Sequence, residues 1–260
     1  MKLNRLILVV TAFAIGMGYL ESAVVVYMRE ILYPGGFRFP LSPIPVELAL
    51  TELFREVATL VMLVTVAVIA SGARVRGSGS GGTGRGSFGS GGARRFSTGF
   101  AWFIYTFAVW DIFYYIFLKL ILGWPDSLMT WDVLFLIPTT WTGPVVTPVL
   151  VSCTMILLAL VILVHAERGL DTRVPGMVWG GLVLGSLVLI LGWILDYSHF
   201  MLDHFTIAGM LRVKNPEVLK VATRYVPVRF PWWLFGAGEA IILVSIGWYW
   251  KTLKQVGNDR

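Results

Sequence analysis

The chain has 260 residues, of which 57% are hydrophobic and 14% charged, with a mean hydropathy of +0.76. This composition is too apolar for a soluble globular domain, and the apolar runs are longer than the alternating strands of a membrane β-barrel. The net charge of +6 therefore indicates membrane topology and contact with lipid headgroups rather than nucleic acid, because the sequence contains no nucleic-acid recognition motif.

Six apolar runs are each long enough to cross a bilayer as a helix, which takes about 20 residues. We therefore expect an all-α fold, a polytopic membrane helix bundle that forms one domain over residues 1–260. The first run has the basic start of a signal peptide, but its length predicts an uncleaved first helix. The expected helices cover residues 6–28, 46–70, 100–122, 144–165, 174–197 and 232–250.

The connecting segments differ in composition. Residues 71–95 are rich in Gly, Ser and Arg and contain no acid, which predicts a disordered cytoplasmic loop. Residues 126–137 are amphipathic and too short to span, so we expect a short interfacial or re-entrant helix there. An amphipathic interfacial helix is expected over residues 216–224, because Asn215-Pro216-Glu217 is a favourable helix start.

The distribution of Lys and Arg favours an orientation with both termini in the cytoplasm. In that orientation twelve basic residues lie inside, and seven, Arg29 among them, lie in the outer loops. The densest basic cluster without acids, residues 71–95, is then cytoplasmic. Cys153 is the only cysteine, so an intrachain disulfide is excluded and the compartment follows from topology alone.

Ionisable groups within the expected spans gather toward the outer face, and the inner halves carry no charge. A carboxylate in mid-membrane costs ~2.5 to 3.5 kcal/mol, so such groups should be paired, buried together or facing water. We expect an outward-facing polar cavity in which Arg55 pairs with Glu52 or Glu56, and Lys119 with Asp111 or a neighbouring acid. Internal salt bridges that only fix helix packing are the structural alternative. The predicted intramembrane polar site comprises Glu21, Glu52, Arg55, Glu56, Asp111, Tyr115, Lys119 and Glu239.

A second group of polar residues follows the fifth expected helix. Asp196, His199 and Asp203 recur at helical spacing with His204 beside them, and they would share a face if that helix continued past Tyr197. Imidazole and carboxylate groups are ligands for zinc or iron, so a divalent metal is an alternative to the expectation of no cofactor. The sequence contains no Walker-type loop, nucleophile elbow, CxxC or HExxH motif.

Several short motifs resemble those of a family of bacterial multi-spanning inner-membrane proteins. They are Trp110-Asp111, Phe113-Tyr114-Tyr115, Gly123-Trp124-Pro125 and the run from Trp131 to Pro138. The resemblance lies mainly within residues 110–144. It implies a location in the bacterial inner (plasma) membrane, and it carries no activity, ligand or catalytic residue.

Three functional hypotheses follow. The favoured one is a non-catalytic membrane subunit or scaffold that contacts a membrane protein partner or a second copy of the chain, because the loops are rich in Trp and catalytic motifs are absent. The second is a small-solute or cation carrier whose binding acids are Asp111, Glu21 and Glu239. The third is a membrane-embedded enzyme that acts on a lipid-linked substrate with a metal near His199. Whether the protein is an enzyme stays open from the sequence.

Overall fold

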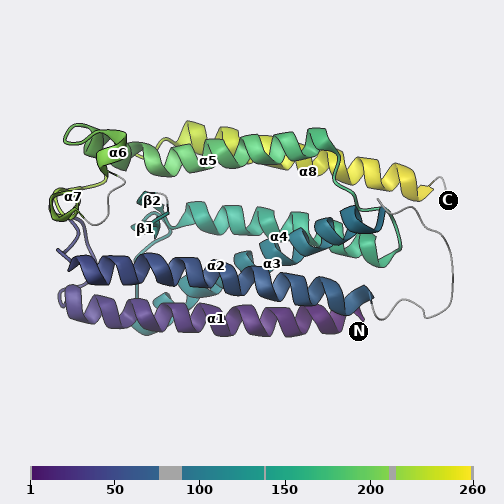
Figure 1. Ribbon diagram of the computed structural model, residues 1–260, viewed down its shortest axis with the longest axis horizontal. Coiled ribbons are helices and arrows are strands. Elements are labelled where there is room, and N and C mark those ends of the chain that lie inside the picture. The colour runs from purple at the N-terminus through teal and green to yellow at the C-terminus, as the bar shows by residue number, and fades with distance from the viewer. Residues whose placement is uncertain (1, 76–89, 138, 211–214, 259–260) are drawn as a thin grey trace.

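The computed structural model describes residues 2–75, 90–137, 139–210 and 215–258. Within them, six helices are long and apolar enough to cross a membrane, and they run side by side as a bundle (Figure 1). The prediction of an all-α, multi-pass membrane protein is therefore confirmed. The six helices are α1 (Leu3–Leu32), α2 (Val46–Val75), α3 (Ser90–Leu122), α4 (Val146–Glu167), α5 (Gly176–Leu202) and α8 (Trp232–Asn258).

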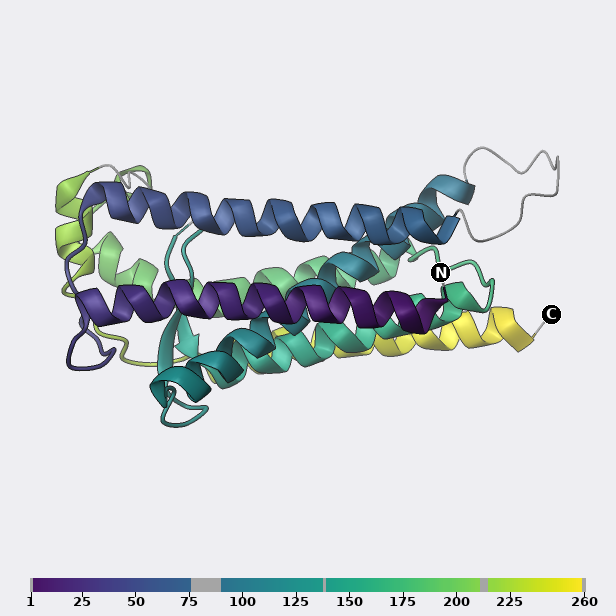
Figure 2. The ribbon, with the colours of Figure 1, turned by 90° about the horizontal axis from the view of Figure 1, so that it is seen from below.

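The short elements gather at one end of the bundle, and both marked chain ends lie at the other (Figures 1 and 2). We call these the hairpin end and the terminal end. The hairpin end holds strands β1 (Trp131–Phe135) and β2 (Trp141–Pro144) and the short helices α6 (Ile207–Met210) and α7 (Pro216–Ala222). The connection between α1 and α2 also lies there.

Helix α3 lies at the centre of one half of the bundle. It packs against α1, α2 and α4, and α4 in turn contacts α8, which pairs with α5. Small residues permit the close approach of α1 and α3: a methyl group added at Gly18 would lie 3.1 Å from the carbonyl oxygen of Trp110. Leu63, Trp102 and Ile162 are fully buried in the apolar core between these helices.

One expected element is wrong. Residues 126–137 do not form a helix, because β1 pairs with β2 in an antiparallel hairpin with Trp131 opposite Pro144 and Phe135 opposite Trp141. The run is rich in aromatic and β-branched residues, which favour strands, and it is too short for a stable helix of its own.

The hairpin is held among the long helices. Its Trp141 indole stacks on Trp193 of α5 with ring centroids 5.5 Å apart, and the N–H of Leu136 donates to Glu56 of α2 at 3.1 Å. A methyl group added at Gly143 would lie 3.0 Å from Trp193, so the strand needs glycine to approach α5. Non-helical backbone is tolerated at membrane depth where protein surrounds it or where it lines a cavity.

Other boundaries differ more modestly. Helix α2 continues to Val75 and α3 begins at Ser90, so both ends of the expected loop over residues 71–95 are helical, and residues 76–89 lie outside the described residues. Pro144 ends β2 instead of starting the fourth helix. The predicted helix after Asn215 is confirmed as α7, and the Asn215 side chain accepts a hydrogen bond from the N–H of Glu217 at 3.1 Å.

Candidate functional site

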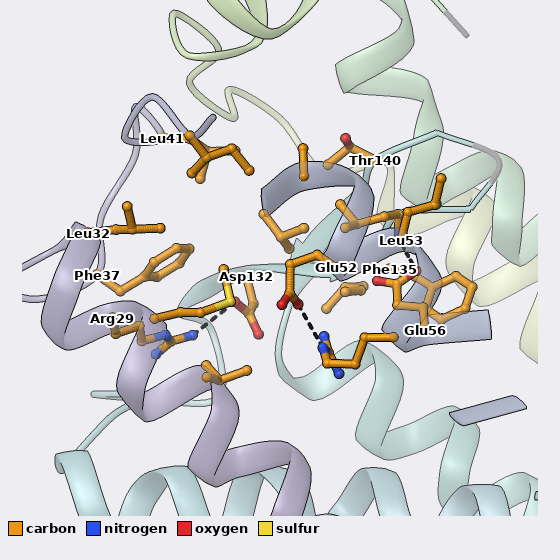
Figure 3. A pocket seen from close by; sticks show the side chains of 18 of the residues that line it. Arg29, Leu32, Phe37, Leu41, Glu52, Leu53, Glu56, Asp132, Phe135 and Thr140 are labelled. Atoms are coloured by element: carbon orange, nitrogen blue, oxygen red, sulfur yellow. Dashed lines mark hydrogen bonds and ion pairs between the residues drawn. The ribbon is translucent and has the colours of Figure 1, made fainter. Parts of the chain in front are cut away.

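A cavity of about 310 Å³ lies at the hairpin end. Helices α1, α2 and α3, the hairpin, α7 and the connection between α1 and α2 all contribute to its wall. It extends from Leu219 of α7 to Asp111 of α3, and side chains such as Leu32, Leu41 and Leu53 make much of its surface apolar (Figure 3).

The structure brings most of the predicted polar residues to this one cavity. Lys119 and Glu239 are not part of its wall. The predicted residues that line it are Glu21, Glu52, Arg55, Glu56, Asp111 and Tyr115. The wall also contains Arg29, Tyr114 and Asp132, which the sequence did not single out, together with several hydroxyl side chains.

Arg55 of α2 joins two acids. Its Nε donates to Glu52 at 2.7 Å one turn earlier on the same helix, as the spacing predicts. Its terminal nitrogen pairs with Glu21 of α1, a partner that the sequence did not indicate. The bridge between Glu21 and Arg55 therefore links α1 to α2 beside the cavity, and the alternative pairing of Arg55 with Glu56 is not formed.

Glu56 and Asp111 form no ion pair with any side chain that the structure describes. Glu56 accepts the N–H of Leu136 from the hairpin, and Asp111 accepts the hydroxyl of Ser152 from α4 at 2.9 Å. Each carboxylate thus has a neutral hydrogen-bond donor and no ion-pair partner among the described side chains. Both remain available to a cationic group in the cavity.

Arg29 and Asp132 form a buried ion pair that the sequence analysis missed. Their side chains are 9% and 3% exposed, and Nη2 of Arg29 lies 3.3 Å from Asp132 (Figure 3). Asp132 also accepts the hydroxyl of Tyr115 at 3.3 Å. Burial raises the pKa of Asp132 to about 6, although the charge of Arg29 acts in the opposite direction. The partners are 103 positions apart, so no local spacing signals their contact.

Two aromatic rings fix the guanidinium of Arg29. The ring of Trp124 lies 3.7 Å from the guanidinium carbon and the ring of Phe37 lies 4.3 Å from it. Both contacts are within cation–π distance. Sequence reasoning treated Arg29 as a topology residue of an outer loop, whereas it is a buried part of the cavity wall.

Two predicted site residues have other roles. The ammonium group of Lys119 donates to the carbonyl oxygens of Gly123 and Pro125 at 2.8 and 2.9 Å, so it caps the end of α3 and its predicted pairing with Asp111 is wrong. Glu239 of α8 accepts the hydroxyl of Thr154 of α4 at 3.1 Å. It belongs to a helix contact outside the cavity and does not join Glu21 and Asp111 there.

The possible metal ligands do not converge. Helix α5 continues past Tyr197 to Leu202, as the metal hypothesis required, but Asp196 accepts the hydroxyl of Tyr225 at 2.7 Å. The other members, His199, Asp203 and His204, are exposed. Across the described part of the chain, no three His, Cys, Asp or Glu side chains are grouped so as to hold a metal ion.

The fold and the site define a multi-pass helical membrane protein with a β-hairpin held among its helices and an acidic cavity beside the hairpin. Comparisons with models of protein families, with curated proteins and with solved structures found no match to this chain. The resemblance of residues 110–144 to a bacterial family stays an expectation from the sequence. Function therefore has to be inferred from the chemistry of the cavity itself.

Proposed function

We propose that the protein is a membrane carrier that binds a small organic cation in the cavity at the hairpin end. The excess of acid in the cavity wall carries this proposal, because five carboxylates and two guanidiniums line it among the described residues. Both arginines are already bonded to acids, which leaves Glu56 and Asp111 for a ligand. An unpaired carboxylate in a poorly hydrated site is unfavourable, and a bound cation offsets that cost.

The remainder of the wall favours an organic cation over a bare metal ion. Trp110, Tyr114 and Phe135 line the cavity together with several leucines. Aromatic faces attract ammonium groups, and apolar side chains offer contact to a carbon skeleton. The volume of about 310 Å³ is at the lower end of the range for small-molecule pockets, which is roughly 300–1,000 Å³.

The other hypotheses have less structural support. A non-catalytic subunit or scaffold with a membrane protein partner does not require a cavity whose acids lack cationic partners. An enzyme with a metal near His199 would need ligands that converge, and Asp196 is already engaged by Tyr225. The carrier hypothesis also changes in one respect, since Glu239 contacts Thr154 and is not one of the binding acids.

The proposal places the cavity on the outer side of a bacterial inner membrane with both termini in the cytoplasm. The basic residues of the expected loop over residues 71–95, together with Lys2 and Arg5, then lie on the cytoplasmic side of the membrane. The contact between Arg29 and Asp132 supports this orientation. Arg29 is neutralised inside the bundle, so it no longer counts among the free basic residues of the outer loops, and the excess of basic residues on the cytoplasmic side becomes larger.

The binding proposal predicts that the protein, purified and placed in lipid nanodiscs, binds choline and the larger cation benzyltrimethylammonium. Glu56→Gln and Asp111→Asn should each weaken binding about tenfold or more, because a hydrogen bond or contact with a charged group contributes about 1.5–3 kcal/mol. Isothermal titration calorimetry measures the affinities. Vesicles containing the protein should also take up labelled choline.

Glu239→Gln is the matched control, because it neutralises an intramembrane acid that lies outside the cavity. Its affinity for both cations should equal that of the unsubstituted protein. Absence of binding by the folded protein would refute the proposal. An equal loss of affinity in Glu239→Gln would also refute it, since the effect would then come from overall charge and not from the cavity.

The orientation predicts which end of the bundle a reagent outside the cell reaches. In a Cys153→Ser background, Glu217→Cys on α7 should react with a membrane-impermeant maleimide on intact spheroplasts. Asp171→Cys at the terminal end should react only after permeabilisation. Both Glu217 and Asp171 are exposed, so accessibility of the side chain does not bias the comparison. The reverse labelling pattern would invert the proposed topology.

A further inference from the structure

The guanidinium of Arg29 is only partly used by the protein. Nη2 donates to Asp132, whereas Nη1 is buried and has no hydrogen-bond acceptor within the described structure. The whole residue is 7% exposed, and it belongs to the wall of the cavity. A buried nitrogen donor without an acceptor is unfavourable and uncommon in native proteins, so this one requires an explanation.

The surroundings of Arg29 restrict what can satisfy Nη1. Trp124 and Phe37 both pack against the guanidinium, and Asp132 lies at its Nη2 side. The carboxylate of Asp132 also accepts from Tyr115 and from the backbone of Val133, so it is already shared among several donors. Arg29 lines the cavity, so a molecule bound there can bring an acceptor to its guanidinium, and a guanidinium binds carboxylate and phosphate oxygens especially well.

We infer that the ligand is a zwitterion: its oxyanion accepts a hydrogen bond from Nη1 of Arg29, and its ammonium group lies near Glu56 and Asp111. This inference rests on the proposed binding of an organic cation. Figure 3 shows Arg29 pointing toward Asp132 at one side of the cavity, with Glu56 well separated from it. The cavity therefore presents a donor and an acid at different places, and one small molecule with two separated charges satisfies both.

The zwitterion also suits the local charge balance. Arg29 is paired with Asp132, so a ligand carboxylate or phosphate near Nη1 lies beside a carboxylate as well as a guanidinium. The cationic end of the same ligand compensates that repulsion. A simple anion would lack this compensation, and a simple cation would leave Nη1 without an acceptor.

The test compares three ligands that share one cationic group. Choline has no anion, betaine carries a carboxylate, and phosphocholine carries a phosphate. At least one zwitterion should bind about tenfold or more tightly than choline. The measurement uses nanodiscs of phosphatidylglycerol, in which no choline headgroup competes. Repeating it in phosphatidylcholine identifies the source of the anion, because weakened phosphocholine binding there points to a lipid headgroup and unchanged binding to a free solute.

The matched variant is the double substitution Arg29→Gln with Asp132→Asn, which removes both charges of the pair and leaves no buried charge alone. It should lose the preference for the zwitterion over choline, because the donor to the oxyanion is gone. If it does not fold, Arg29→Lys keeps the charge but not the planar fork, and it should lose most of that preference. Folding is checked by a monodisperse elution profile.

The outcomes separate this inference from the proposed function. Choline binding as tight as that of both zwitterions would refute the anion subsite and leave the cation site intact. A zwitterion preference that persists in the double variant, or in Arg29→Lys when only that variant folds, would refute the assignment to Arg29. Failure of all three ligands to bind would remove the proposed function together with the inference.

Discussion

Asp132→Ala is expected to be the most destabilising single substitution in this protein. It leaves the guanidinium of Arg29 buried without the carboxylate that pairs with it, and Tyr115 loses its acceptor as well. Removing one member of a buried ion pair costs about 3–5 kcal/mol, and we expect a loss of stability of this size. Unfolding of the detergent-solubilised protein by heat or denaturant, followed by tryptophan fluorescence, measures it.

Two controls distinguish the buried pair from a general effect of lost charge. Asp126→Ala removes an exposed acid from the same connection and should change stability little. The double substitution Arg29→Met with Asp132→Leu replaces both charges by apolar groups, and it should cost less than Asp132→Ala alone. If the double variant is the less stable of the two, the pair itself contributes more than the unpaired charge costs, and the prediction fails.

Gly185→Leu is expected to separate α5 from α8. A methyl group added at Gly185 would lie 2.5 Å from Cγ1 of Ile242 and 2.8 Å from the carbonyl oxygen of Gly238. A backbone oxygen cannot rotate away as the end of a side chain can, so the helices have to move apart. Overpacking of this kind costs about 1–3 kcal/mol, which should appear as a lower midpoint of thermal unfolding.

Gly180→Leu is the matched control on the same helix, because a methyl group at Gly180 meets no atom within 4 Å. It should leave the unfolding midpoint unchanged or raise it slightly, since leucine favours helix more than glycine does. Equal losses in both variants would mean that helix propensity or general bulk, and not the contact between α5 and α8, determines the effect.

The acidic site was partly predictable because of a strong physical constraint. A carboxylate in an apolar span is costly, so the positions of Glu21, Glu56 and Asp111 already indicated groups that need partners or water. The spacing on α2 likewise predicted that Arg55 pairs with Glu52 or Glu56, because these residues share one helix face, and the pair with Glu52 is the one that forms.

The partners of two other intramembrane residues were predicted wrongly, because they depend on how a helix is rotated or on the turn that follows it. Glu239 lies about as deep in its expected span as Glu21 does in the first one. The rotation of α8, however, directs Glu239 toward Thr154 of α4. Lys119 lies on the same ridge as Asp111, but the carbonyl oxygens of Gly123 and Pro125, in the turn that follows α3, accept its ammonium group. The contact of Glu239 joins positions 85 apart, so no local spacing signals it.

From the sequence alone, the number and approximate position of the spanning helices follow. The free energy of transferring a segment from water into the bilayer depends mainly on the residues of that segment and little on its neighbours in the fold. The folded chain decided the rest. Only packing of distant segments could bring Arg29 of α1 to Asp132 of a β-hairpin and place both beside Glu56, because contacts between residues about a hundred positions apart depend on how the helices pack and rotate.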